Sequence, residues 1–94
     1  MDASDPRVLF GKHLARVRKS LGWSQEKLAL ESGLARSYLG GVERGQRNIA
    51  LVNICKLADA LNVPPSKLME FSASERTLQL EQVGFHPIAE KQSK

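Results

Sequence analysis

The sequence predicts an all-α fold of five short helices, followed by a C-terminal tail. Apolar residues recur at spacings of three and four along most of residues 6–71, which is the helical period. Glycine or proline interrupts the pattern where a helix must end, at Gly22, Gly33, Gly45 and Pro64. The 94 residues are 41% hydrophobic and 26% charged, which suits one small globular domain.

The first helix is expected from about Pro6 to Leu21. Pro6 suits the first helical turn, and Asp5 before it is a candidate N-cap. One face of this helix is apolar and carries Phe10, Leu14, Val17 and Leu21. Three basic residues lie mostly on other faces, where solvation is commoner than phosphate contact: Lys12, Arg16 and Lys19.

Two more short helices are expected on either side of Gly33. The first spans Gln25–Ser32 behind the N-cap Ser24, and the second runs from about Ala35 to Arg44. Only a few residues separate the two apolar patterns, so the backbone must reverse sharply, and glycine adopts the required positive φ without steric cost. This arrangement is a helix-turn-helix, whose second helix lies in the major groove of DNA.

Polar residues on the second of these helices are candidates for DNA contact. Arg36 and Ser37 occupy the first turn, which is the part of a recognition helix that reaches base edges. An arginine can donate two hydrogen bonds to guanine, which discriminates between bases by about 1–3 kcal/mol. We expect base contacts from Arg36, Ser37, Tyr38 and Arg44. We expect phosphate contacts from Gln25 at a helix N-terminus and from Arg47 and Asn48 in the following loop.

The same helix contains Gly40 and Gly41, and two glycines inside a helix cost about 1 kcal/mol each relative to alanine. Either they permit close approach to DNA or to another helix, or they merely loosen the helix. We favour close approach. Because glycine has no side chain to read a base, recognition must depend on few residues.

The last two helices are expected over Leu51–Leu61 and residues 65–71. The buried stripe of the longer helix is expected to consist of Leu51, Ile54, Leu57, Ala58 and Leu61. In the shorter helix, Leu68 should face inward, with Met69 or Phe71 near the surface. Surplus apolar residues on these helices suggest a dimer interface, for which we expect Val52, Cys55, Met69 and Phe71. Two copies about one duplex turn apart would multiply specificity.

We expect three parts along the chain: an N-terminal arm (1–6), a DNA-binding domain (7–71) and a tail (72–94). The tail has conflicting signals, since Leu78 and Leu80 alternate like a strand whereas Ser74 is a possible helix cap. It either packs on the domain, extends a dimer interface, or binds a second protein as a disordered segment.

The charge distribution and the composition indicate the class of partner and the cellular compartment. Residues 1–50 hold nine Lys and Arg against five Asp and Glu, whereas residues 51–94 hold five of each, so the excess positive charge lies beside the helix-turn-helix. Such a distribution indicates a polyanionic partner. The sequence has no long apolar run, and Cys55 is its only cysteine, which suits a reducing compartment. We therefore expect a cytoplasmic bacterial protein of the nucleoid, without membrane attachment.

Motifs for enzymatic chemistry are not apparent. The sequence has no Gly-rich phosphate loop, no paired-carboxylate pattern and no Cys/His spacing typical of a metal site. His13 and His86 stand alone, and Cys55 lies on an expected core helix. We expect neither catalysis, nor a metal, nor a cofactor.

Residues 10–68 resemble the Cro/phage-repressor family of helix-turn-helix regulators. The resemblance rests on GKHLARVR in the first helix, WSQEKLALESGL leading into the turn, YLGGVERG, and LADALNV before the last helix. It implies a five-helix lambda-repressor-like domain that binds double-stranded DNA. It also implies a partly buried ion pair between Arg18 and Glu43.

A narrower resemblance covers RSYLGGVERGQRN, which is similar to the recognition segment of controller proteins from restriction–modification systems. These are small dimeric regulators of their own operons, and the resemblance implies DNA contacts from Arg36, Ser37 and Tyr38. The chain departs from such controllers in its longer tail and its two adjacent glycines. Our leading hypothesis is therefore a homodimeric, sequence-specific regulator. The alternative is an antitoxin-type protein that autoregulates through this domain and binds a partner through residues 72–94.

Overall fold

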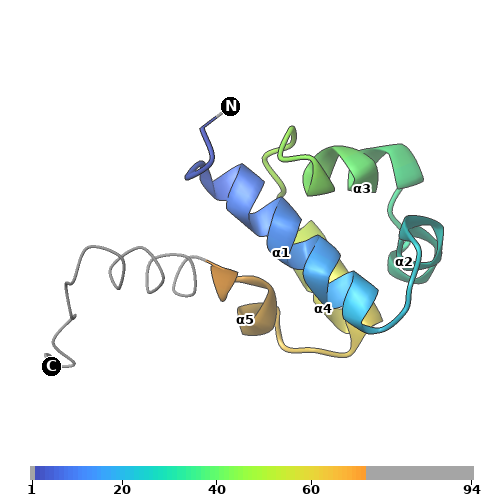
Figure 1. The fold of residues 1–94 in the computed structure, drawn as a ribbon. Helices are drawn as coiled ribbons and strands as arrows, with labels where there is room; N and C mark the ends of the chain where they lie inside the picture. The colour runs from blue at the N-terminus through green and yellow to red at the C-terminus, as the bar shows by residue number, and fades with distance from the viewer. Residues whose placement is uncertain (1, 72–94) are drawn as a thin grey trace, which may run out of the picture.

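The computed structural model describes residues 2–71, and there it contains five helices and no strand. These are α1 (Pro6–Ser20), α2 (Gln25–Ser32), α3 (Arg36–Glu43), α4 (Leu51–Leu61) and α5 (Pro65–Leu68). The all-α, five-helix prediction is confirmed. In Figure 1, α2 and α3 lie together on one side of α1, and α5 lies on the other side. The expectations for the tail, residues 72–94, fall outside the described residues.

The helix starts follow from local sequence. Asp5 caps α1, because its Oδ1 accepts a hydrogen bond from the backbone N–H of Arg7 at 2.8 Å. The side chain of Arg7 also donates to Asp5, and this hydrogen bonding lowers the pKa of the Asp5 carboxyl to about 2. At the start of α2, the Ser24 hydroxyl accepts from the backbone N–H of Lys27 at 3.0 Å. Both expected N-caps are therefore confirmed.

The turn between α2 and α3 depends on Gly33, which has a φ of 77° and ends α2 in the left-handed conformation. The bounds of α2 and α4 agree with prediction, and α3 is one residue shorter at each end than expected. α5 ends at Leu68, three residues before the predicted end, because Met69 leaves helical geometry with a φ of −101°.

The core is a single apolar cluster to which every helix contributes. Each of the five helices places one leucine in it with no exposed area: Leu14, Leu28, Leu39, Leu57 and Leu68. Phe10, Val17, Val42 and Leu61 fill the spaces between them. Because all five helices meet in one cluster, the position of α3 depends on the whole domain rather than on its own turn.

Three sequence-based expectations about the core are wrong. Leu51 is 73% exposed rather than part of the buried stripe, because α4 begins there and its first turn extends past the core. Leu21 is 48% exposed, because α1 ends at Ser20 and Leu21 is its C-cap. Phe71 is only 5% exposed, because the turn after α5 returns the chain to α1, where its ring meets that of Phe10 edge-on with centroids 6.1 Å apart.

Among the described residues, no helix has the length and apolar character needed to cross a bilayer. The same residues contain no group of three or more His, Cys, Asp and Glu side chains close enough to hold a metal ion.

Candidate nucleic-acid interface

The polar side of α3 faces outward. Leu39 and Val42 are 0% and 1% exposed, whereas Arg36 and Ser37 in the first turn are exposed, as is Arg44 at the C-terminal end. The N-cap residue of α3, Ala35, makes no side-chain capping hydrogen bond. The first N–H groups of α3 have no acceptor within the helix, so they remain available to an acceptor from outside.

Arginine side chains cover the two glycines of α3. A Cβ built on Gly40 would lie 3.1 Å from Nη1 of Arg44 and 3.5 Å from Nη1 of Arg36. Both guanidinium groups therefore converge over one point, although the residues are eight apart in sequence. At Gly41 a Cβ would lie 3.0 Å from Cγ of Arg47. Within the described residues, the atoms that approach these two glycines belong to side chains: Arg44, Arg36 and Gln25 of α2 at Gly40, and Arg47 at Gly41.

Arg47 is held above α3 by this packing. Its guanidinium carbon lies 5.8 Å from the centroid of the Tyr38 ring, which is within the range of a cation–π contact. The Tyr38 hydroxyl in turn accepts a hydrogen bond from the side-chain amide of Asn53 on α4 at 3.1 Å. Tyr38 is half-buried, so it links α3 to α4 as well as facing the expected interface. Asn48 is exposed in the loop beyond Arg47.

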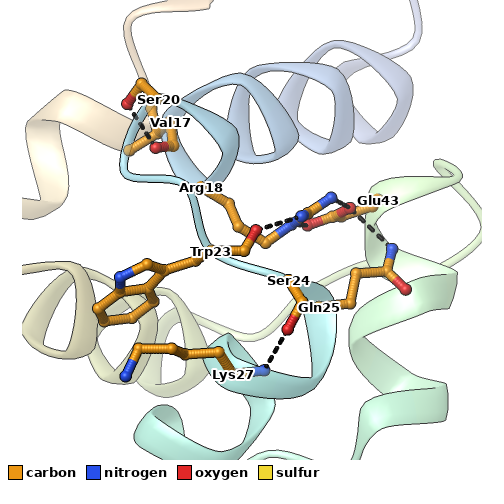
Figure 2. A network of polar contacts seen from close by, with 8 residues as sticks. All are labelled: Val17, Arg18, Ser20, Trp23, Ser24, Gln25, Lys27 and Glu43. Atoms are coloured by element: carbon orange, nitrogen blue, oxygen red, sulfur yellow. Dashed lines mark hydrogen bonds and ion pairs between the residues drawn. The ribbon is translucent and has the colours of Figure 1, made fainter.

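A buried ion pair joins α1 to α3, as the family resemblance implies. Nε of Arg18 lies 2.7 Å from Oε2 of Glu43, and Nη2 donates to Oε1 at 2.8 Å, so the pair is bidentate. The two side chains are 8% and 6% exposed. A third nitrogen of Arg18 donates to the backbone carbonyl of Trp23 at 2.7 Å (Figure 2). The hydrogen bonds to Glu43 raise the pKa of the Arg18 guanidinium above its ordinary value.

Gln25 belongs to the same hydrogen-bond network. The sequence analysis did not predict this contact. Its amide nitrogen donates to Oε1 of Glu43 at 2.8 Å, so the side chain of the first residue of α2 meets the last residue of α3 (Figure 2). One amide hydrogen of Gln25 remains for a phosphate. No local pattern marks a contact between residues eighteen apart, so only the fold reveals it.

The residues expected at a dimer interface differ in exposure. Val52 and Met69 are 64% and 50% exposed, and Cys55 is half-buried on α4. Leu51, one turn before Cys55, adds further exposed apolar surface. Phe71 belongs to the core of the domain instead, so it does not offer the exposed surface that the expected interface needs.

Comparisons with known proteins agree with the helical fold. A family model described as helix-turn-helix matches residues 14–68. Control protein C.BamHI of Bacillus amyloliquefaciens is 46% identical over 67 residues, which span 70% of this chain and 83% of the relative. The crystal structure of the restriction-modification controller protein C.AhdI from Aeromonas hydrophila is 60% identical with a TM-score of 0.65, covering 66% of this chain and 94% of that one.

A third similar protein is the hypothetical transcription factor NHTF from Neisseria. Its crystal structure is 40% identical with a TM-score of 0.71, and the match covers 83% of this chain and 90% of that one. The family match spans all five helices except the beginning of α1, and it includes every residue expected to contact DNA, from Gln25 to Asn48. The chain therefore belongs to the helix-turn-helix family of Cro/phage-repressor-type DNA-binding regulators.

Proposed function

We propose that the protein regulates transcription as a homodimer, with α3 of each protomer in the major groove of double-stranded DNA. The observation that carries the proposal is the convergence of two exposed arginines, Arg36 and Arg44, over the buried Gly40. Guanine presents two acceptors in the major groove, O6 and N7, which match the paired donors of a guanidinium. The fold and the family supply the context in which such a helix reads DNA.

The side chains divide into two groups in this proposal. Arg36, Ser37, Tyr38 and Arg44 read base edges from α3. Gln25, Arg47 and Asn48 contact phosphates on either side and fix the orientation of the domain. Tyr38 keeps a hydroxyl hydrogen to donate, because its oxygen is the acceptor in the contact with Asn53.

Dimerisation follows from the length of α3 and from the exposed apolar residues. An eight-residue helix is about 12 Å long, so one protomer reads only a few base pairs. Three exposed apolar side chains on α4 and just after α5 are available for a second copy to cover: Leu51, Val52 and Met69. A two-fold arrangement pairs such a surface with itself and predicts an inverted-repeat operator.

The relatives favour one form of this function. Because C.BamHI and C.AhdI are described as control proteins, we propose that this chain likewise regulates a restriction–modification operon. None of the relatives named above is described as an antitoxin. The segment on which that alternative depends, residues 72–94, lies outside the described residues.

Selection of binders from a random duplex library at near-physiological salt tests the proposal. We expect enrichment of two inverted half-sites about one helical turn apart. A controller-type role further predicts that the selected operator lies upstream of the protein's own gene. Recovery of no motif, with binding that disappears as salt rises, would reduce the function to electrostatic attachment and contradict the proposal.

Arg36→Ala should weaken binding to the selected operator by about 1–3 kcal/mol while binding to random duplex changes little. The reason is that Arg36 is exposed in the first turn of α3, where removal of a base-reading guanidinium costs specificity without removing core packing. Competition assays with both duplexes measure the difference. An equal loss on both would remove Arg36 from base readout.

Arg47→Ala provides the complementary result, because Arg47 is assigned to phosphate. Binding to operator and to random duplex should weaken alike, and the slope of log K against log salt should become shallower by about one unit. The measurement is a salt titration on both duplexes. A loss confined to the operator would instead make Arg47 a base-reading residue.

A further inference from the structure

A shallow hollow of about 470 Å³ lies next to the exposed face of α3. α1 forms one wall, the start of α2 and the end of α3 form the others, and the hollow opens to solvent. Lys12, Arg16 and Lys19 line it from α1, and Arg44 lines it from beyond the end of α3. Arg44 thus belongs both to this hollow and to the proposed base-reading face.

The hollow concentrates positive charge. Its lining holds five cationic side chains and one anionic one, a net charge equal to the +4 of the whole chain. The single carboxylate, Glu43, is neutralised by Arg18 in the buried pair. Lys12, Arg16, Lys19 and Arg44 form no ion pair within residues 2–71, so their charge is available to an outside anion.

A fixed polar cluster and a helix N-terminus border these cations. Arg18, Glu43 and Gln25 are tied together by hydrogen bonds of 2.7–2.8 Å and line the hollow together (Figure 2). The N–H groups of Gln25 and Glu26 stand at the start of α2 and have no intrahelical acceptor, whereas Ser24 satisfies that of Lys27. The positive end of the α2 dipole therefore adds to the field of the side chains.

We propose that this hollow binds backbone phosphates of the same duplex that α3 reads, which makes α1 a third DNA-contacting element. The inference rests on the proposed function and extends it. Arg44 connects the hollow to the reading face, so the strand that borders the major groove at the end of α3 passes over Lys12 and Arg16. The basic side chains of α1 would thus contact DNA phosphates, whereas the sequence alone favoured solvent exposure for them.

The openness of the hollow favours a polymer over a small anion. Long exposed lysine and arginine side chains hold an isolated anion weakly, because water and salt screen the attraction. A duplex gains the release of its condensed counterions at each neutralised phosphate, which strengthens binding without an enclosed pocket. We therefore assign the site to phosphodiester oxygens of DNA. The experiment must distinguish this ligand from free phosphate.

The test is a salt titration of the double variant Lys12→Ala/Arg16→Ala. Both residues are exposed on a helix that alanine suits, so the fold should persist, as circular dichroism can verify. Lys67→Ala is the matched control, because it removes an exposed cation from α5, across the domain from α3. We expect the double variant to weaken binding to operator and random duplex by a similar factor. Its slope of log K against log salt should be about two units shallower than that of Lys67→Ala.

A slope equal to that of Lys67→Ala would overturn the assignment. A second arm titrates inorganic phosphate into the DNA-free protein and follows the amide signals of α1 and α2 by NMR. Saturable phosphate binding that the double variant abolishes, with an unchanged duplex slope, would identify a small-anion site instead. Because the slope on random duplex needs no operator, failure of this inference is distinguishable from failure to select one.

Discussion

Glu43→Ala is expected to lower the free energy of unfolding by about 3–5 kcal/mol, the usual cost of removing one partner of a buried ion pair. The substitution leaves the Arg18 guanidinium 8% exposed without its carboxylate, and it also removes the acceptor of the Gln25 amide. The end of α3 would lose its tie to α1 and to α2 together. Chemical denaturation monitored by circular dichroism or by the single Trp23 measures the loss.

Two further variants test whether the loss of stability comes from leaving a buried charge without its partner. Glu31→Ala breaks the pair between Lys27 and Glu31, whose side chains are 49% and 48% exposed, and it should cost less than about 1 kcal/mol. The double variant Arg18→Met/Glu43→Leu removes both charges together and should recover much of the stability that Glu43→Ala loses. A loss for Glu43→Ala no larger than that for Glu31→Ala would show that the pair does not hold the helices together.

Gly11→Ala is expected to destabilise the domain by about 1–3 kcal/mol, although alanine is the better helix former. A Cβ at Gly11 would overlap the carbonyl oxygen of Val42 and lie 2.7 Å from that of Glu43. Both atoms are backbone at the end of α3, so relief requires α1 and α3 to separate rather than a side chain to rotate. The melting temperature and the denaturation midpoint report the effect.

Gly40→Ala is the matched control, because it also replaces a buried glycine inside a helix. Its Cβ would meet the far end of the flexible Arg44 side chain at 3.1 Å, which can rotate away. The free energy of unfolding should stay the same or rise by up to about 1 kcal/mol. The convergence of Arg36 and Arg44 over this position should be lost. Equal stability of the Gly11 and Gly40 variants would contradict the close packing of α1 on α3.

Local chemistry made much of this fold predictable. The N-caps Asp5 and Ser24, the turn at Gly33 and the bounds of α2 follow from residues within a few positions of each helix end. The outward direction of Arg36 and Ser37 follows from helical period, because Leu39 and Val42 must face the core.

The remaining features depend on contacts between residues far apart in sequence. Phe71 is buried because a turn after α5 returns it to Phe10, and periodicity within α5 carries no information about that return. The hydrogen bond from Gln25 to Glu43 and the convergence of arginines over Gly40 depend on how side chains lie in the folded domain. The close packing of α1 on α3 at Gly11 likewise depends on the backbone carbonyls of Val42 and Glu43, which lie far from Gly11 in sequence.

The closeness of α1 to α3 has a consequence for the duplex. The end of α3 is held against α1 by the contact at Gly11 and by the buried pair of Arg18 and Glu43, and its tilt within the protomer is therefore fixed. In the proposed dimeric complex, a half-site whose shape does not suit that tilt must itself bend, twist or change groove width. Base steps that deform easily should consequently be preferred between the half-sites, even at positions that no side chain touches.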